Sequence, residues 1–392
     1  MGTWPFSWKP GASRILVACK LKGMNVTIEK VDCQLFHIPL PQVLTDSMHG
    51  EMTHFGLVTV TIQDHEGAEG TGYTYTVGKT GGTAILSLLS QDLTPLLIGE
   101  DADRIDTLWE KLWWALHFVG RGGLASFAIA AVDIALWDLK SRRADQPLWK
   151  FLGGTNPEVA AYAGGIDLQL PLDDLLRQTE QNLELGFQAI KMKVGRELLA
   201  EDVQRVSAMR TLLGPDIPLM VDANMRWTVD EAILAAQAFA DQHLYWLEEP
   251  TIPEDFTGHH RIQAEGGIPV ASGENLHTVY EFEKLIAAGG AAFPEPDVAN
   301  IGGITAWLKV AHHAEAWQLP VTSHGVHDLH VHLLSAIPNA SYLEVHGFGL
   351  ERFLESPLVI AEGQATAPSR PGHGVQFKWP LLEKHQVTRS PG

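Results

Sequence analysis

The sequence predicts an α/β protein made of a TIM-type (β/α) barrel that follows an α+β N-terminal lobe. Three observations support this prediction. Eight short apolar strand candidates alternate with helix-like stretches between Ala160 and Gly347, as parallel βαβ units require. An ionisable residue stands at the end of each strand from the second to the eighth, where a barrel places its chemistry. Hydrophobic residues make up 45% of the chain, enough for a large core.

The N-terminal part of the chain divides into two segments. Residues 1–23 are predicted to be a disordered extension outside the folded unit, because their apolar stretch is short for a signal peptide and no cleavage site follows. Residues 24–150 are predicted to form the α+β lobe. The expected strands are Val26–Leu40, Phe55–Asp64 and Gly67–Val77, and the expected helices are Thr83–Leu97, Arg104–Phe118 and Gly122–Lys140.

Residues 151–348 are predicted to form the barrel that carries the active site, and residues 349–392 to pack back on the N-terminal lobe. The eight strand candidates are 160–166, 189–194, 218–224, 245–250, 269–275, 294–300, 320–325 and 342–347. Their ionisable residues are spaced 20 to 31 residues apart and are Lys191, Asp222, Glu248, Glu274, Asp297, His324 and Glu344. One such residue at a strand end is commonly a cap or turn residue, but seven at this regular spacing indicate a site.

Composition excludes several functional classes. Lys plus Arg total 28 against 47 for Asp plus Glu, a net charge of −19, so the chain has no basic surplus for binding nucleic acid. No apolar run approaches the roughly 20 residues of a membrane span. The two cysteines are too few for a disulfide framework. We therefore expect a cytoplasmic protein with no nucleic-acid or membrane partner.

The stretch QAIKMKVG places Lys191 and Lys193 on one face of a strand and Ile190, Met192 and Val194 on the other. Taken alone, this pattern is typical of an edge strand with two solvated lysines. Within the wider set of strand ends, it suggests a base and a partner cation. A lysine can remove a proton when its pKa is well below about 10.4, and a neighbouring lysine and a metal ion act in that direction. Lys193 is the candidate base, and Lys191 the cation that binds the substrate.

Asp222, Glu248 and Glu274 come from three consecutive strands. Adjacent ionised carboxylates repel one another unless a cation lies between them, and oxygen ligands suit a hard divalent ion. The sequence therefore predicts a Mg²⁺ site. Asn224 shares the inward face of Asp222 and is a candidate substrate ligand, whereas Glu249 is expected to point away into a salt bridge of the barrel wall.

His324 and Asp297 are expected to act as a pair, with the carboxylate holding one imidazole nitrogen and leaving the other free for proton transfer. Glu344 is expected to be protonated and to donate to a developing enolate oxygen. Two proton carriers beside a metal-bound carboxylate predict abstraction of the proton α to that carboxylate.

These motifs resemble those of the enolase superfamily, and within it the mandelate racemase subgroup. They are KMK at 191–193, VDAN at 221–224, WLEEP at 246–250, SGEN at 272–275, EPDVANIGGIT at 295–305, SHG at 323–325 and LEV at 343–345. The resemblance implies a modified barrel, capped by the N-terminal domain and the tail. It also implies that Asp222, Glu248 and Glu274 bind Mg²⁺, that Lys193 and the His324–Asp297 pair are acid/bases, and that Lys191 and Glu344 stabilise carboxylate and enolate.

The substrate is expected to be set by the cap loop LPQVLTDSMHGEMTHFG and two further stretches. Their side chains are polar or cationic, as binding a polyhydroxylated acid requires. Lys79 or Arg121 could hold a distal carboxylate. The candidate substrate-binding residues, with Asn224, are Thr45, Ser47, His49, Tyr75, Lys79 and Arg121.

The layout looks most like the acid-sugar dehydratases of the talarate and galactarate type. It predicts a Mg²⁺-dependent hydro-lyase that removes the α-proton and eliminates the β-hydroxyl of an aldarate or aldonate, leaving a 2-keto-3-deoxy acid sugar. A racemase or epimerase acting through the same enolate, a lactone cycloisomerase and, more distantly, a non-catalytic sugar-acid binding protein stay open. A homo-oligomer, from dimer to octamer, is expected.

Overall fold

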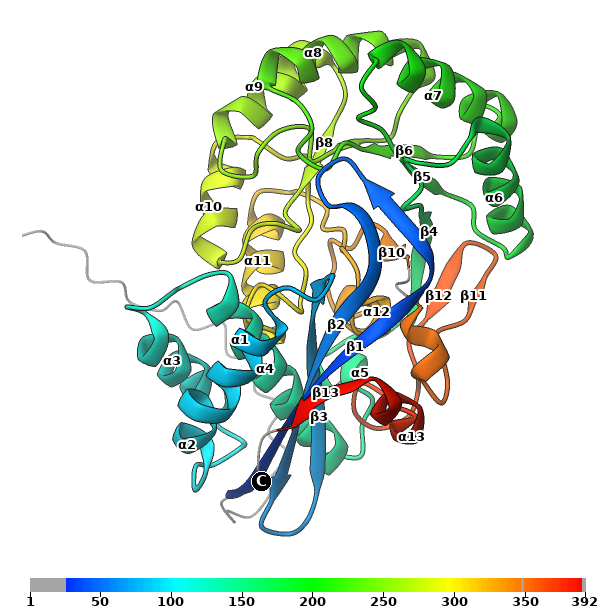
Figure 1. Ribbon diagram of the computed structural model, residues 1–392. Coiled ribbons are helices and arrows are strands. Elements are labelled where there is room, and N and C mark those ends of the chain that lie inside the picture. The colour runs from blue at the N-terminus through cyan, green and yellow to red at the C-terminus, as the bar shows by residue number, and fades with distance from the viewer. Residues whose placement is uncertain (1–25, 347–348, 390–392) are drawn as a thin grey trace, which may run out of the picture.

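The N-terminal lobe is built on a four-stranded antiparallel sheet. The computed structural model describes residues 26–346 and 349–389, so the predicted extension 1–23 lies outside the described residues. Strands β1 (Ile28–Asp46), β2 (Gly50–Asp64) and β3 (Glu69–Val77) pair in sequence order, and β13 (Gln386–Arg389) adds to the free edge of β1. Figure 1 shows this sheet beside the barrel.

The residues predicted as the loop 40–56 belong instead to the long β1–β2 hairpin. Leu44 pairs with Met52 and Asp46 with Gly50, and both apolar side chains are buried. The turn is closed by Asp46, whose Oδ1 accepts hydrogen bonds from the backbone N–H groups of Met48 and His49 at 2.9 and 2.6 Å. This local side-chain bonding is typical of Asp in turns, and the hairpin it closes extends across the barrel (Figure 1).

The first predicted helix of the lobe, Thr83–Leu97, is divided into three pieces. These are α1 (Gly82–Ser87), the π-helical turn η1 (Leu88–Leu93) and α2 (Thr94–Leu97). Pro95 has no N–H to donate to the preceding turn, so the hydrogen-bond register changes ahead of it. The helix α3 (Ile105–Leu116) follows, and then α4 (Leu124–Arg143) and α5 (Leu148–Phe151).

Helix α4 joins the lobe to the barrel. It packs so closely on β3 that a Cβ on Gly70 or Gly72 would lie 2.2 or 2.0 Å from a carbonyl oxygen of the helix. On its other side, Asp133 accepts hydrogen bonds from the backbone N–H and the hydroxyl of Thr305 at 2.9 and 2.6 Å. The two parts of the molecule are therefore held together by buried polar contacts as well as by apolar packing.

The barrel alternates strands and helices, as the sequence predicts. Its parallel strands pair in the order β4, β5, β6, β7, β8 and β9, and β10 returns to pair with β4. The bounds are β4 (Glu158–Gly164), α6 (Leu172–Glu184), β5 (Ile190–Lys193), α7 (Leu199–Leu213), β6 (Leu219–Asp222), α8 (Val229–Ala238), η2 (Ala240–Gln242), β7 (Leu247–Glu248), α9 (Phe256–Gly266), β8 (Val270–Ser272), α10 (Val279–Ala287), β9 (Phe293–Pro294), α11 (Ile304–Ala316), α12 (His327–Leu334) and β10 (Leu343–Val345).

The seventh expected strand, 320–325, is not a regular strand. It is reduced to a bridge between Val321 and Ala340, and the Thr322 N–H donates a backbone hydrogen bond of 3.1 Å to the Pro294 carbonyl on β9. Pro320 lacks an N–H with which to begin a ladder. These contacts of Val321 and Thr322 still close the barrel between β9 and β10. The predicted fold class, a modified barrel with a capping domain, is confirmed.

The tail packs on both parts of the molecule. Strands β11 (Ile360–Ala361) and β12 (Gln364–Thr366) form a small hairpin, and β12 pairs antiparallel with β4 of the barrel. Further on, β13 joins the lobe sheet. The remaining elements are η3 (Leu350–Phe353), α13 (Trp379–Leu382) and η4 (Glu383–His385).

Buried histidines connect the tail to helix α12 of the barrel and to the short helix α5. His332 on α12 accepts a hydrogen bond at Nδ1 from the Trp149 N–H (3.2 Å), and its Nε2 lies 2.8 Å from the His373 carbonyl oxygen. Only a neutral imidazole protonated at Nε2 satisfies both partners. Burial, together with His373, lowers the pKa of His332 to about 3.

This histidine predicts a pH dependence of stability. The pKa of His332 is lower in the folded protein than in the unfolded chain. Its contribution to the free energy of unfolding is therefore complete above about pH 6.5 and is lost as the pH falls toward 3. We expect His332→Asn to lower the free energy of unfolding at pH 7. Between pH 6.5 and 4, however, that free energy should decline less steeply than in the wild type, by up to about 1.4 kcal/mol per pH unit.

Urea unfolding at several pH values measures this slope. The matched control is His65→Asn, which alters an exposed histidine in the β2–β3 turn. Equal slopes for the wild type and both variants would contradict a neutral buried His332.

Candidate active site

The two lysines of β5 lie inside the barrel mouth. Lys191 is 1% and Lys193 6% exposed, which rules out the solvated edge strand. Ile190 and Met192 point the other way, into the apolar layer between strands and helices. The Nζ of Lys191 contacts Glu248 and lies 2.6 Å from Glu344 Oε1. Alternation along a short strand therefore directs both ammonium groups toward the carboxylates of neighbouring strands.

Three carboxylates meet at the ends of β6, β7 and β8. Each of Asp222, Glu248 and Glu274 offers one oxygen, and these oxygens lie within 4.8 Å of one another. The three side chains are buried. Burial, together with Asp222 and Glu344, raises the pKa of Glu248 to about 8 despite the adjacent Lys191. Glu248 therefore favours its protonated form at neutral pH, whereas all three carboxylates together would exceed the charge of the two lysines if each were ionised.

The predicted lowering of the Lys193 pKa is opposed by the neighbouring carboxylates. Burial favours the neutral amine, but the carboxylates of Asp222 and Glu274 outweigh burial and the repulsion from Lys191, so the pKa is raised. Lys193 Nζ contacts Asp222 directly. Lys193 therefore favours its protonated form and is ion-paired with Asp222.

His324 lies at the Glu274 end of the carboxylate cluster, whereas Lys193 lies at the Asp222 end. The Nδ1 of His324 is 3.0 Å from Asp297 Oδ2, and its Nε2 is 3.2 Å from Glu274 Oε2. Burial opposes protonation of the ring, but Glu274 and Asp297 raise its pKa to about 10. The geometry keeps Nε2 directed toward the cluster, where it can exchange a proton with a ligand.

Tyr75, predicted to bind the substrate, instead contacts this pair. Its hydroxyl donates a 2.7 Å hydrogen bond to Asp297 Oδ2 and lies 3.3 Å from His324 Nδ1. The side chain comes from β3 of the lobe, which reaches over the barrel. The lobe therefore helps to orient the histidine.

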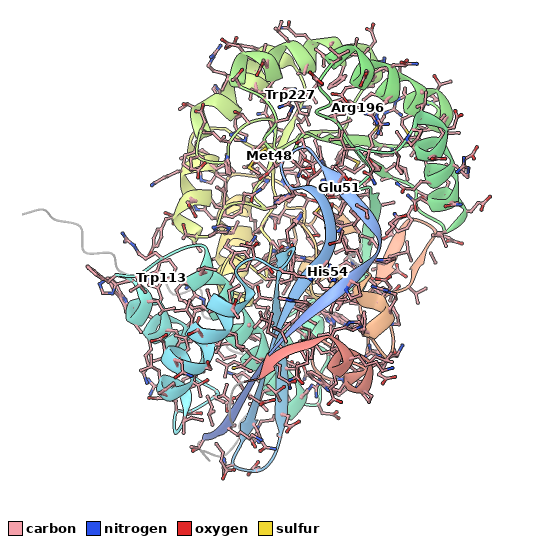
Figure 2. All side chains as sticks on the ribbon, viewed as in Figure 1. Met48, Glu51, His54, Trp113, Arg196 and Trp227 are labelled. Carbon is pink, nitrogen blue, oxygen red and sulfur yellow. The ribbon has the colours of Figure 1, made fainter. Side chains whose placement is uncertain are left out.

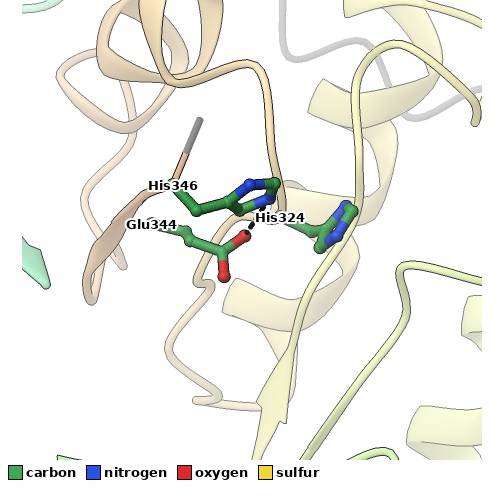
Figure 3. Close-up of side chains that lie close together, drawn as sticks. All are labelled: His324, Glu344 and His346. Atoms are coloured by element: carbon green, nitrogen blue, oxygen red, sulfur yellow. Dashed lines mark ion pairs between the residues drawn. The ribbon is translucent and has the colours of Figure 1, made fainter. Parts of the chain in front are cut away.

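Glu344, at the end of β10, is ionised rather than protonated, contrary to the prediction. Its Oε2 accepts a hydrogen bond of 2.8 Å from the Gly325 N–H and lies 3.2 Å from His346 Nε2. Burial opposes ionisation, but His346 and Lys191 lower the pKa of Glu344 well below its usual range. Figure 3 shows His346 beside both Glu344 and His324, and the two imidazole rings are 5.4 Å apart.

The hairpin tip covers the mouth of the barrel. Ser47 donates a hydrogen bond of 2.6 Å to the Ala223 carbonyl at the end of β6, and His49 pairs with the buried Asp46 at 2.7 Å. Hydrogen bonding to Asp46 and the nearby Glu274 raise the pKa of His49. Met48 lies at the tip and is 53% exposed, whereas His54 lies farther from the tip along β2 (Figure 2).

The other predicted substrate residues differ in their positions. Thr45 is half-buried and bridges the backbone at Asp167. Asn224 is buried, with a side-chain Oδ1 that makes no hydrogen bond. Lys79 and Arg121 are exposed, and no described contact brings either of them to the carboxylates. The structure therefore gathers the catalytic and metal candidates and leaves these two cations outside.

Glu249 does not form the predicted salt bridge. Its Oε2 accepts a 2.6 Å hydrogen bond from the Asn275 amide. Burial, Glu274 and Asp222 raise its pKa well above the usual range, which favours the neutral form of the acid.

Sequence reasoning missed two residues of this region, His346 and Asp167. His346 stands two residues after Glu344, so the strand period of two already places it on the same face. Asp167 follows the first barrel strand, continuing the pattern of an ionisable residue at each strand end, and accepts a 2.9 Å hydrogen bond from the Lys193 N–H. Both signals were present in the sequence.

The residues fit a divalent cation. Glu274 Oε2 is buried and makes no hydrogen bond, although it lies 3.2 Å from His324 Nε2. Two more carboxylates lie within reach of the same point, and Mg²⁺ prefers such oxygen ligands. Asp222, Glu248 and Glu274 are the residues that could hold it.

Known proteins share both parts of this architecture. Residues 35–153 match the mandelate racemase / muconate lactonizing enzyme N-terminal domain, and residues 174–381 match the enolase C-terminal domain-like family. Among the described residues, no helix is long and apolar enough to cross a membrane.

Three relatives span nearly the whole chain. A 3,6-anhydro-alpha-L-galactonate cycloisomerase from Streptomyces coelicolor is 56% identical over 92% of this chain and 99% of its own. The structure of a racemase from S. coelicolor with bound magnesium is 54% identical, with a TM-score of 0.90, over 92% of this chain and 100% of its own. The L-talarate/galactarate dehydratase of Salmonella typhimurium, solved with Mg and L-lyxarohydroxamate, is 33% identical, with a TM-score of 0.88, over 93% of each chain.

The carboxylate cluster predicts stabilisation by magnesium. Millimolar MgCl₂ should raise the melting temperature of the wild type by a few degrees, because a ligand present at about 100 times its Kd stabilises by about 2.7 kcal/mol. Glu274→Gln should lose most of this increase, because it removes one ligand charge. Differential scanning fluorimetry measures the shift.

The matched control is Glu283→Gln, which removes an exposed carboxylate from α10 and should respond to magnesium like the wild type. A Glu274→Gln variant that keeps the full shift would exclude this carboxylate as a ligand.

Proposed function

We propose a function from the premise that the chain belongs to the mandelate racemase / muconate lactonizing enzyme family of the enolase superfamily. The protein is a Mg²⁺-dependent enzyme that opens a 3,6-anhydro sugar acid. The reaction removes the proton α to the carboxylate and expels the β-oxygen. The observation that carries this choice is the 56% identity to the cycloisomerase over nearly both full chains.

The chemistry is a β-elimination in which the leaving oxygen stays attached. The C2–H bond breaks and its proton goes to the base, and the electron pair forms the C2=C3 bond as the C3–O ether bond breaks. The ring oxygen takes a proton and becomes the C6 hydroxyl. The resulting enol tautomerises to a 2-keto-3-deoxy acid with the same composition as the substrate, which makes the reaction an isomerisation.

Lys193 and His324 are the proton carriers in this proposal. They contact Asp222 and Glu274, at the two ends of one carboxylate cluster, so a substrate bound between them would face one group on each side. One takes the α-proton, and the other protonates the departing oxygen. Which one acts first depends on the configuration at C2.

The neighbouring residues position these groups. Asp297 and Tyr75 hold His324 with Nε2 toward the cluster, and Lys191 supplies a buried positive charge for the substrate carboxylate. The hairpin tip reduces access of water to the mouth. A Mg²⁺ ion held by Asp222, Glu248 and Glu274 would supply positive charge to the substrate carboxylate and would offset the carboxylates that raise the pKa of Lys193.

The second candidate is a hydro-lyase that acts on an open-chain acid sugar. It shares the first bond cleavage and differs only in expelling a β-hydroxyl as water. The similarity to the talarate/galactarate dehydratase supports it. Racemisation needs the same enediolate and returns the proton to C2.

Proton NMR in D₂O with Mg²⁺ separates the three reactions. We expect 3,6-anhydro-L-galactonate to give a ring-opened 2-keto-3-deoxy acid carrying one deuterium at C3. Loss of water from galactarate or talarate in its place would favour the hydro-lyase. Deuterium entering C2 with no elimination from any of these acids would favour the racemase.

Single variants of the two proton carriers should separate their roles. Lys193→Ala and His324→Asn are each expected to lower turnover by about 10²- to 10⁴-fold, the usual contribution of a general acid or base. The variant that lacks the base should also lose exchange of the α-proton, whereas the variant that lacks the acid should retain it.

Exchange and elimination are followed in the same NMR experiment, with the exposed-lysine variant Lys30→Ala as the control. Elimination within a few-fold of the wild type in both active-site variants would exclude these roles.

A further inference from the structure

Two histidines and a carboxylate form a second cluster of metal-binding side chains at the barrel mouth. His324, Glu344 and His346 each offer one ligand atom, and these atoms lie within 4.8 Å of one another. Figure 3 shows the two imidazole rings gathered beside the carboxylate. Among the described residues, the other cluster of this kind is the set of three carboxylates at the ends of β6, β7 and β8.

The two clusters differ in their donor atoms. Carboxylate oxygens alone suit Mg²⁺, whereas two imidazole nitrogens with one carboxylate oxygen suit a softer divalent ion such as Zn²⁺ or Co²⁺. In a tetrahedral zinc site, bonds of about 2.1 Å separate neighbouring ligand atoms by about 3.4 Å. His346 Nε2 and Glu344 Oε2 lie 3.2 Å apart, so the spacing of this pair fits a bound zinc ion.

His324 is held in the way that metal-ligating histidines commonly are. Its Nδ1 is 3.0 Å from Asp297 Oδ2, and the Tyr75 hydroxyl donates a 2.7 Å hydrogen bond to the same oxygen. A carboxylate that accepts from one ring nitrogen fixes the tautomer and the orientation of the imidazole. Because Asp297 engages Nδ1, Nε2 is the nitrogen left to bind a metal.

The surroundings allow an ion to enter and partly offset its charge. His346 lines a cavity of about 610 Å³ between the β1 arm of the hairpin, the ends of β4 and β10, and helix α6. The carboxylates of Glu344 and Asp297 can balance a divalent charge. Burial opposes protonation of His324, but Glu274 and Asp297 raise its pKa to about 10. An entering ion must displace that proton, so binding should strengthen as the pH rises.

We propose that His324, Glu344 and His346 form a second metal site, which takes Zn²⁺ or a similar divalent ion and blocks the active site by occupying His324 Nε2. The binding of zinc does not depend on the proposed function. The block rests on it, because His324 is a proton carrier only in that proposal.

The test is a titration of Zn²⁺ into the full-length protein at pH 8, followed by calorimetry. Excess MgCl₂ is present throughout, so that the three carboxylates at the ends of β6, β7 and β8 are occupied. His346→Asn removes one nitrogen ligand of the proposed site. The matched control is His65→Asn, which removes an exposed imidazole from the β2–β3 turn.

We expect one zinc ion per chain in the wild type and in His65→Asn, and an affinity about tenfold lower or weaker still in His346→Asn, because a metal ligand is lost. Equal zinc affinity in the wild type and His346→Asn would overturn the site. So would the absence of zinc binding to the wild type in excess Mg²⁺.

Cobalt gives a second readout that needs no variant. Co²⁺ with four or five ligands that include imidazoles absorbs visible light more strongly than Co²⁺ in an octahedral shell of oxygens. The wild type with Mg²⁺ and one equivalent of Co²⁺ should show the stronger absorption. The weak octahedral spectrum alone would contradict the proposed ligands.

The block is measured separately on the acid that the protein turns over. Saturating Zn²⁺ should lower elimination by the Mg²⁺-loaded wild type by about 10²-fold, the lower end of what a general acid or base contributes. Unchanged elimination with zinc bound would refute the block. A protein that binds zinc through His346 and turns over none of the tested acids would retain the metal site and refute the proposed chemistry.

Discussion

The excess of buried negative charge at the barrel mouth is the constraint on which the rest of the site depends. Asp222, Glu248 and Glu274 lie together with two lysines against them, and Glu344 extends the charge to the next strand. Burying like charges is unfavourable unless cations compensate them. Because two ammonium groups leave this charge only partly compensated when all the carboxylates are ionised, the cluster favours a divalent cation.

The strand ends of the barrel bring these charged side chains together. Each strand contributes one or two side chains, so the charges are distributed over a rigid ring rather than along a flexible loop. Paired strands also fix the direction of each side chain, as the alternation in β5 shows. The lobe then adds what the barrel lacks: Tyr75 contacts the His324–Asp297 pair, and the hairpin tip covers the mouth.

The sequence by itself determined the alternation of barrel strands and helices and the residues at their ends, because both follow from local periodicity. The period of two in KMK predicts a shared face for Lys191 and Lys193, and the regular spacing of Asp222, Glu248 and Glu274 predicts that they converge. Only the tertiary structure decided the protonation of Lys193 and Glu344, the hairpin in place of a loop, the role of Tyr75 and the outlying positions of Lys79 and Arg121. These features depend on distances between residues far apart in the chain, and a carboxylate or ammonium group takes its pKa from the charges and burial around it rather than from its sequence neighbours.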